Sequence, residues 1–391
     1  MRPFSSVFKD ESKLDINYVP QRLPHRESEL NLLTQFFRFV VENPRKMTQR
    51  VLIIGSIGTG KTVLSQHFGQ NITKEAQRKG INLQYVHVNC RECKGSFFLI
   101  LQRALLRFSP HFPRRGYSAQ ELLQAFMQVL DEQDAHLILV LDELDALVHS
   151  EGSDPLYSLT RVQEERSGHA QRLSLIGILR ETSYLDALDP STRSTLQRNI
   201  IPLEEYSTLQ LRDIINDRVV LAFRENVVPT QTIDLTAELA AMEGGDARYA
   251  IELLWRAGKY ADTAESRDVV PEHVRKAAVS VYPVVRKDAV SSLGLHEKLF
   301  LLGVARRFKQ TGAAYLSMGE AENAYAIVCE EYGERQRGHT QLWKYVQVLS
   351  ASDIIKAEPS SVGHRGKTTM ISLPRIPASD LERELSKLLG I

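Results

Sequence analysis

Residues 55–62 read Gly55-Ser56-Ile57-Gly58-Thr59-Gly60-Lys61-Thr62, the pattern G-x-x-x-x-G-K-T, and they follow the short apolar run 51–54. This pattern is typical of a phosphate-binding loop when it lies between a strand and a helix. The glycines let the backbone wrap closely round a triphosphate, so that successive N–H groups point at phosphate oxygens. The alternative is a glycine-rich turn that matches by chance, and the strand before it and the helix after it argue against that reading.

Two side chains of this loop are expected to carry the chemistry. Lys61 should reach the β- and γ-phosphates, and the hydroxyl of Thr62 should ligate Mg²⁺. The helix that follows turns its partially positive N-terminus toward the same charge. The predicted nucleotide site of the loop consists of Gly55, Ser56, Ile57, Gly58, Thr59, Gly60, Lys61, Thr62 and Val63.

A second apolar run, 137–141, ends directly in Asp142-Glu143-Leu144-Asp145. An apolar run with carboxylates at its end suits a central parallel strand, because the C-terminal ends of such strands face the ligand crevice. Asp142 is expected to hold Mg²⁺ through its water shell, and Glu143 to orient and deprotonate the attacking water. A buried strand with an acidic exit is the alternative. The pairing with the phosphate loop favours an ATPase with Lys61, Asp142 and Glu143 as catalytic residues.

The whole chain has 391 residues, of which 43% are hydrophobic and 25% charged, and its net charge is +1. Two or three globular domains are expected from this length and composition. A chain so nearly neutral is no polycation, so any nucleic-acid surface must be local. The N-terminus lacks the apolar segment of a signal peptide, and no stretch approaches the roughly 18 apolar residues that span a bilayer. The cytoplasm is the expected compartment, and no membrane partner is expected.

The three cysteines are too few for a disulfide framework. Cys90 and Cys93 have the spacing of a redox motif or of half a zinc site, but no second pair of ligands is visible. Small buried thiols are the favoured interpretation, and a functional pair is the alternative.

Apolar strands alternate with amphipathic helices in the first half of the chain, which predicts an α/β domain with a doubly wound parallel sheet. From about residue 206 the strand signals stop, and helix start signals predict a small all-helical domain. The expected strands are 51–54, 84–90, 137–141 and 173–179. The expected helices are 61–79, 95–108 and 118–132, then 207–226, 234–243, 246–264 and 271–281.

The last hundred residues predict a winged helix, because three helices are followed by two strands and a loop at 359–366. The helices are expected at 295–309, 317–332 and 338–350, and the strands at 353–358 and 367–373. Residues 335–375 hold seven basic and two acidic residues, a net +5. This excess favours DNA as the partner, with a protein-binding winged helix as the alternative. The expected contacts are Thr340, Gln341 and Lys344 in the major groove, and Arg365 and Lys367 on phosphates or in the minor groove.

The order of these parts resembles that of the archaeal and eukaryotic replication initiators of the origin recognition complex and cell-division-control type. Those proteins combine an AAA+ ATPase, a helical lid and a C-terminal winged helix. The resemblance therefore implies domains at 1–205, 206–282 and 283–391. It rests on the nucleotide motifs together with the N-terminal segment 18–27, the lid segment 205–211 and the run Gly245-Asp246-Ala247-Arg248-Tyr249-Ala250.

The resemblance also implies further contacts to ATP or ADP and to DNA. The implied nucleotide contacts are Tyr18, Val19, Pro20, Arg26, Tyr206 and Arg248. Arg248 corresponds to the family's second sensor, and an arginine in the first turn of a lid helix can couple lid angle to phosphate charge. A surface arginine is the alternative. The family's DNA-contacting insertion falls near 94–117, where Arg114 and Arg115 either touch DNA or are solvated loop residues.

Two positions depart from the family's pattern. A polar first sensor, commonly Asn, usually follows the strand 173–179, and Arg180 stands there instead. An arginine usually follows the proline of Leu188-Asp189-Pro190, but here Ser191 does, with Arg193 two residues later. Slow hydrolysis with little activation by a neighbouring subunit is therefore expected.

The favoured function is an ATP-dependent replication initiator that binds origin duplex DNA through its winged helix and its AAA+ insertion. It would use ATP binding and slow hydrolysis, with Mg²⁺, as a switch for recruiting a replicative helicase. Other initiator subunits are further candidate partners, and the nucleoid is the expected place of action. The alternatives are a clamp-loader or helicase-like motor, and a winged-helix regulator whose nucleotide is structural.

Overall fold

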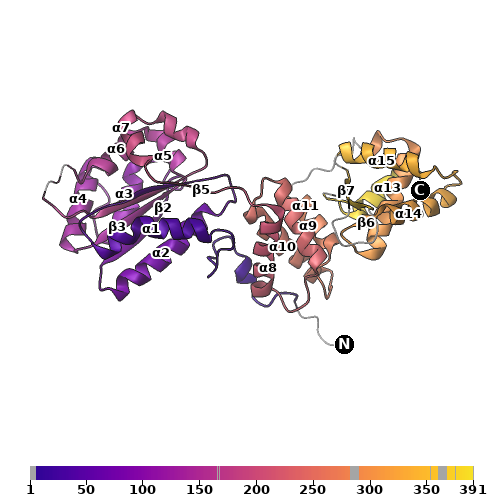
Figure 1. Ribbon diagram of the computed structural model, residues 1–391, viewed down its shortest axis with the longest axis horizontal. Coiled ribbons are helices and arrows are strands. Elements are labelled where there is room, and N and C mark those ends of the chain that lie inside the picture. Colours follow the sequence, from indigo (N-terminus) through magenta and orange to yellow (C-terminus); the bar gives the residue numbers. More distant parts are fainter. Residues whose placement is uncertain are drawn as a thin grey trace. The chain divides into compact units, whose positions relative to one another are not determined.

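The computed structural model describes residues 6–164, 166, 168–281, 290–352, 354–359, 368–374 and 376–390 (Figure 1). The chain forms two compact units, one made of residues 19–206 and the other of residues 1–18 with 207–391. Within the described ranges, no helix is long and apolar enough to cross a membrane.

The unit 19–206 is built on a parallel five-stranded sheet in the order β2-β3-β4-β1-β5. The expected α/β class is confirmed, and each of the four expected strands lies within one residue of its expected bounds. The short edge strand β5 was not expected from the sequence. The strands are β1 Arg50–Ile54, β2 Leu83–Asn89, β3 His136–Asp142, β4 Leu173–Leu179 and β5 Ile200–Pro202.

Helices cover both faces of this sheet, and Figure 1 shows α1 and α2 on one side and α3, α5 and α6 on the other. Successive side chains of a strand point to opposite faces, so one apolar run serves two cores. Val51 and Ile53 pack with α1 and α2, whereas Leu52 and Ile54 belong to the core under α3 to α7. The helices are α1 Glu27–Glu42, α2 Lys61–Arg78, α3 Phe97–Leu105, α4 Ala119–Glu132, α5 Leu144–Glu151, α6 Asp154–Arg161 and α7 Pro190–Leu196.

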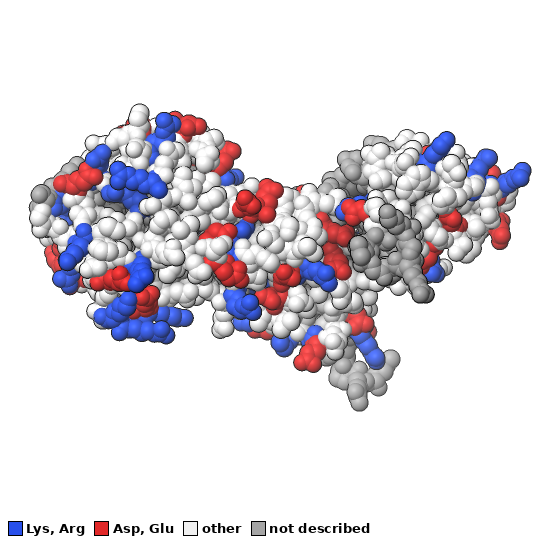
Figure 2. Space-filling view, viewed as in Figure 1, with Lys and Arg blue, Asp and Glu red and all other residues white. Residues whose placement is uncertain are grey.

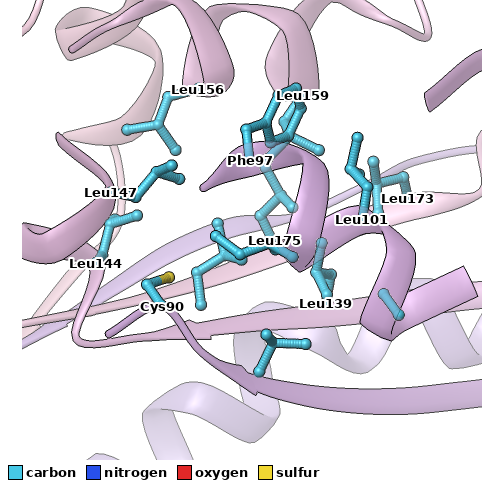
Figure 3. Close-up of a cluster of buried hydrophobic side chains, with 14 of the residues drawn as sticks. Cys90, Phe97, Leu101, Leu139, Leu144, Leu147, Leu156, Leu159, Leu173 and Leu175 are labelled. Atoms are coloured by element: carbon cyan, nitrogen blue, oxygen red, sulfur yellow. The ribbon is translucent and has the colours of Figure 1, made fainter. Parts of the chain in front are cut away.

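The larger of these two cores also contains the sulfur of Cys90. Figure 3 shows Leu139 and Leu175 of the strands together with Leu101 of α3 and the Cys90 side chain. Cys90 and Cys93 are buried free thiols, and burial raises the pKa of Cys90. A thiol that resists ionisation is a poor nucleophile and a poor metal ligand. This favours the structural interpretation of the cysteines.

Four helices open the second unit, and all four were expected from the sequence. They are α8 Thr208–Ala222, α9 Thr230–Met242, α10 Ala247–Thr263 and α11 Pro271–Val281. The N-terminal stretch belongs with them: Phe8 bridges Phe223 with their ring centroids 4.8 Å apart, and Trp255 donates a hydrogen bond to Glu11 at 2.7 Å. The boundary expected from the sequence puts residues 1–18 in the nucleotide domain, whereas this apolar anchoring places residues 6–18 in the unit of the lid.

The C-terminal part of the second unit is a winged helix with an antiparallel sheet in the order β6-β8-β7. The three expected helices and two expected strands are present, and β6 and α16 are additional. β6 has only two residues and exists through its pairing with β8, which no local pattern signals. The elements are α13 Leu295–Thr311, β6 Leu316–Ser317, α14 Met318–Glu331, α15 His339–Ala351, β7 Lys356–Pro359, β8 Thr369–Ser372 and α16 Ala378–Leu388.

A buried arginine joins the lid helices to the winged helix within this unit. The side chain of Arg275 on α11 is fully buried, and its Nε donates to the carbonyl oxygen of Leu373 at 3.0 Å. One terminal nitrogen donates to the carbonyl oxygens of Ala313 and Ala314, each at 3.0 Å. Its remaining charge is balanced by Glu272 at 3.2 Å.

Candidate functional site

The phosphate-binding loop runs from the end of β1 to the start of α2, as the sequence predicts. Gly58 and Gly60 have φ angles of 77° and 90°, a region that side-chain-bearing residues rarely adopt. A Cβ at Gly55 would lie 2.4 Å from the carbonyl oxygen of Leu203, so only glycine fits there. The ammonium of Lys61 donates to the carbonyl oxygens of Gly55 and Ser56, each at 2.6 Å. The loop therefore holds the Lys61 ammonium close to its own backbone. There, phosphate oxygens can replace the carbonyl oxygens as acceptors of its hydrogen bonds.

Asp142 ends β3 beside the loop and is almost fully buried, with 5% of its surface exposed. The Thr62 hydroxyl donates to its Oδ2 at 2.8 Å, and the backbone N–H of Glu143 donates to its Oδ1 at 2.9 Å. His87 of β2 also contacts Oδ2, at 3.1 Å. Burial alone would raise the pKa of Asp142, but the hydrogen bonds from His87, Thr62 and Glu143 outweigh it and lower the pKa. The carboxylate is therefore ionised at neutral pH.

These residues fit a magnesium ion of the kind that phosphate-binding loops use. Mg²⁺ is usually held by one or two carboxylates, waters and substrate phosphates rather than by a cage of protein ligands. The hydroxyl of Thr62 and the ionised Asp142 supply adjacent oxygen donors of this type. The described residues contain no cluster of three or more His, Cys, Asp or Glu that could hold a metal ion.

Glu143 and Arg180 lie together at the same end of the sheet. Glu143 is the N-cap of α5 and has a left-handed backbone, with φ 49° and ψ 50°. Arg180 follows β4, which pairs directly with β3. Its guanidinium lies 3.7 Å from Oε1 of Glu143. The residue at the first-sensor position is thus ion-paired with the expected general base.

A guanidinium group also lies beside Ser191, the residue after Pro190, but it belongs to a residue of another helix. Arg161 of α6 donates to the hydroxyl of Ser191 at 2.8 Å. Arg193, on the same helix α7 as Ser191, pairs instead with Asp186 at 3.2 Å. No sequence pattern links residues 161 and 191, so the sequence analysis missed Arg161.

Arg26 and Tyr206 flank the phosphate loop from one side. Arg26 is buried, its Nε donates to the carbonyl oxygen of Thr59 at 3.1 Å, and its guanidinium lies 4.1 Å from the centre of the Tyr206 ring. The Tyr206 hydroxyl lies 3.0 Å from the point where a Cβ of Gly60 would be. Two residues that the sequence placed in the nucleotide site are therefore brought to the loop.

The other predicted nucleotide contacts are not gathered in the same way. Pro20 lies near α2, where its carbonyl oxygen is 3.1 Å from Nδ1 of His67, and Val19 precedes it. Tyr18 and Arg248 belong to the second unit. There the guanidinium of Arg218 lies over the Tyr18 ring at 4.9 Å, and the N–H of Arg248 is capped by Asp246 at 2.8 Å. Their contact with a nucleotide stays a prediction.

Those candidate DNA residues that the structure describes lie on exposed surfaces. Arg114 and Arg115 are exposed in the turn between α3 and α4, and the Arg114 carbonyl oxygen accepts a hydrogen bond from Gln102 at 2.9 Å. Arg365 and Lys367 lie outside the described residues. Figure 2 shows blue and red side chains interleaved over the visible face, in keeping with the nearly neutral net charge.

Helix α15 presents a continuous exposed face that is wider than the sequence indicated. Leu342, Val346 and Leu349 are buried, whereas Thr340, Gln341 and Lys344 are exposed. Other exposed residues of this helix, among them Trp343, Gln347 and Val348, were not predicted from the sequence. The spacing of Gln347, three residues beyond Lys344 and seven beyond Thr340, was the signal that could have found it.

Comparison with known families matches three segments of this chain. Residues 22–176 match the AAA ATPase domain, residues 212–279 the Cdc6 AAA+ ATPase-type lid domain, and residues 288–383 the C-terminal winged helix domain of CDC6. The matches follow the same order as the nucleotide domain, the lid and the winged helix described above.

Curated relatives and solved structures agree with these matches over almost the full chain. ORC1-type DNA replication protein 2 of Sulfurisphaera tokodaii is 35% identical over 99% of this chain and 93% of its own length. Cdc6p from Pyrobaculum aerophilum has a TM-score of 0.85 at 31% identity, covering 98% of this chain and 99% of that one. The Aeropyrum pernix ORC1 protein, solved in complex with DNA, has a TM-score of 0.65 at 29% identity, covering 98% and 97%.

Proposed function

Because this chain belongs to the ORC1/Cdc6 family of DNA replication proteins, we propose that it is an ATP-dependent replication initiator that binds duplex DNA at origins. The observation that carries the nucleotide part is the convergence of Lys61, Thr62, Asp142 and Glu143 at one end of the parallel sheet. DNA binding is supported by the winged helix and by the A. pernix relative that was solved with DNA.

In this proposal the nucleotide site works chiefly by holding charge. Lys61 would leave its two carbonyl partners for the β- and γ-phosphates, and the loop N–H groups would surround them. Thr62 and Asp142 would hold Mg²⁺, which neutralises the charge that the phosphates share. Glu143 would take the proton of the attacking water. Arg26 and Tyr206 would border the bound nucleotide beside the loop.

Two features of the site support slow hydrolysis. Arg180 competes for the carboxylate of Glu143, so the base has a partner other than water. Arg193 is paired with Asp186 and Ser191 with Arg161, so neither residue of α7 is pre-set to reach a neighbour's nucleotide. Arg248 would then let the lid respond to ATP rather than to turnover.

The DNA part of the proposal uses the exposed face of α15. Thr340, Gln341 and Lys344 would enter the major groove, where side-chain amides and ammonium groups read base edges. Arg365 and Lys367 would contact phosphates or the minor groove, and Arg114 and Arg115 a second stretch of duplex. A replicative helicase and further initiator subunits would be recruited at the nucleoid by the ATP-bound form.

A Lys61→Ala variant tests the nucleotide part. The lysine donates to two carbonyl oxygens of the loop and does not belong to an apolar core, so ATP binding should be lost while the free energy of unfolding changes by no more than about 0.5 kcal/mol. ATP binding is measured by titration calorimetry, and unfolding by urea titration without nucleotide. Wild-type ATP affinity in this variant would refute the proposed site.

Two alternatives predict other outcomes for the wild-type protein. A clamp-loader or helicase-like motor would show turnover that DNA stimulates strongly. A regulator with a structural nucleotide would retain it through purification and bind DNA equally with ATP and ADP. The pairing of Arg193 with Asp186 argues against a motor that depends on an arginine from its neighbour.

A further inference from the structure

His87 lies on the edge strand β2 and points at the carboxylate of Asp142. In the β2–β3 register His87 pairs with Val140, two residues before Asp142 and on the same face of the sheet. Its Nε2 is 3.1 Å from Oδ2 of Asp142, and its side chain is 19% exposed. Because an ionised carboxylate only accepts hydrogen bonds, Nε2 must carry the proton and donate.

The surroundings of Nδ1, the other ring nitrogen of His87, indicate that the ring serves its contact with Asp142 rather than core packing. Nδ1 of His87 is buried and has no hydrogen-bond partner among the described residues. A buried polar atom without a partner costs about 1–3 kcal/mol, which an apolar residue at this position would avoid. The His87 ring is therefore poorly suited to simple core packing, and its one hydrogen bond in the described structure goes to Asp142.

The Asp142 carboxylate is fixed at both oxygens. Thr62 and His87 converge on Oδ2, and the N–H of Glu143 holds Oδ1. Donors on both oxygens define the rotation of the carboxylate plane, and with it the direction in which the group can receive a hydrated cation. Hydrogen-bonding partners of metal-binding groups typically change metal affinity or activity by about 10–100-fold when they are removed.

We propose that His87 is a positioning residue for the magnesium site, which orients Asp142 and thereby sets how much Mg²⁺ the protein needs to bind ATP tightly. This inference rests on the proposed nucleotide site. His87 does not itself hold the ion, because Mg²⁺ strongly prefers oxygen ligands and the imidazole nitrogen already faces the carboxylate.

The test compares His87→Phe and His87→Gln in the full-length protein. Binding of a fluorescent ATP analogue is measured as Mg²⁺ is raised from zero in EDTA. His87→Phe should need about 10–100-fold more Mg²⁺ for half-maximal enhancement of binding, with an unchanged affinity in EDTA. His87→Gln, whose amide can still donate to Asp142, should lie between His87→Phe and wild type. Electron paramagnetic resonance of Mn²⁺ with ATP gives the same ranking without any turnover.

A Tyr85→Phe variant is the matched control. Tyr85 lies on the same strand and face as His87, but its hydroxyl bonds Ser65 at 2.7 Å, so its Mg²⁺ requirement should equal that of wild type. If His87→Phe does not fold, His87→Asn replaces it, because the shorter amide falls short of Asp142. A wild-type Mg²⁺ requirement in the His87 variants would overturn the inference. Wild-type protein that binds no ATP, or binds it independently of Mg²⁺, would instead refute the proposed site.

Discussion

Glu143 is the residue where the geometry of the site departs most from ordinary backbone. A residue with a side chain in the left-handed region costs about 1–3 kcal/mol and persists only where its surroundings hold it. Here the hydrogen bond from its N–H to Asp142 and the ion pair with Arg180 hold it. The carboxylate is thereby placed at the end of β3, but in contact with a permanent cation.

An Arg180→Asn variant should hydrolyse ATP faster than wild type and bind it less tightly. The Arg180 and Glu143 side chains are 37% and 31% exposed, and ion pairs of this exposure are worth about 0.2–1 kcal/mol. Freeing Glu143 should therefore raise the single-turnover rate by no more than about fivefold. Rapid-quench measurement checks the rate, and Arg180→Lys, which keeps the charge, serves as control. A slower Arg180→Asn enzyme would show that Arg180 assists the chemistry.

At the scale of helices and strands, the sequence predicts what depends on local pattern. The strands 51–54 and 137–141 are apolar runs that end in decisive motifs, and they are confirmed within one residue. Strand β5 has three residues and β6 two, and each exists through pairing with a distant strand. Helix α1 is not among the helices predicted from the sequence, although the helical spacing of Leu33, Phe37 and Val41 indicates it.

In the nucleotide site, too, the sequence predicts residues that lie in local motifs but not contacts between distant segments. Thr62 and Asp142 follow from motifs, and the structure joins them at 2.8 Å. His87 reaches Asp142 only through the register of β2 against β3, which the sequence does not fix. Arg161 reaches Ser191 across two helices. Contacts that depend on strand register and helix packing could therefore not be predicted from the sequence.

The contacts of Arg275 connect α11 to the winged helix, and their contribution to stability can be measured. An Arg275→Met variant would leave three backbone carbonyls and the carboxylate of Glu272 without their partner. Losing one member of a buried charged network typically costs about 3–5 kcal/mol. Urea unfolding of Arg275→Met should show this loss of unfolding free energy, or two separate unfolding transitions in place of one.

The control is Arg383→Met, at an ion pair on α16 whose arginine is 68% exposed. It should change the free energy of unfolding by less than about 0.5 kcal/mol. Equal midpoints for the two variants would refute this contribution of Arg275.

At the scale of the whole molecule, we propose that the protein acts as a switch rather than a motor. Self-assembly should then have little effect on hydrolysis, because Arg193 is paired with Asp186 and the Arg161 guanidinium beside Ser191 is already hydrogen-bonded within its own chain. ATPase rate per molecule should stay nearly constant as protein concentration rises, with or without duplex DNA. A trans-acting arginine typically raises the rate by about 10³–10⁵-fold where it operates. A steep rise that disappears in Arg193→Ala would make the protein an assembly-activated ATPase.

We propose that bound ATP, and not its turnover, sets the affinity for DNA. The direct measurement is the dissociation constant for one fluorescent duplex at fixed salt, with Glu143→Gln protein holding Mg²⁺ and ATP, and with the same protein holding ADP. The substitution should slow hydrolysis about 10²–10⁴-fold, so ATP stays intact during the titration. Coupling between two sites is commonly about 1–3 kcal/mol, so the two constants should differ by about 5–150-fold. Equal constants would contradict the switch and leave the nucleotide a structural role.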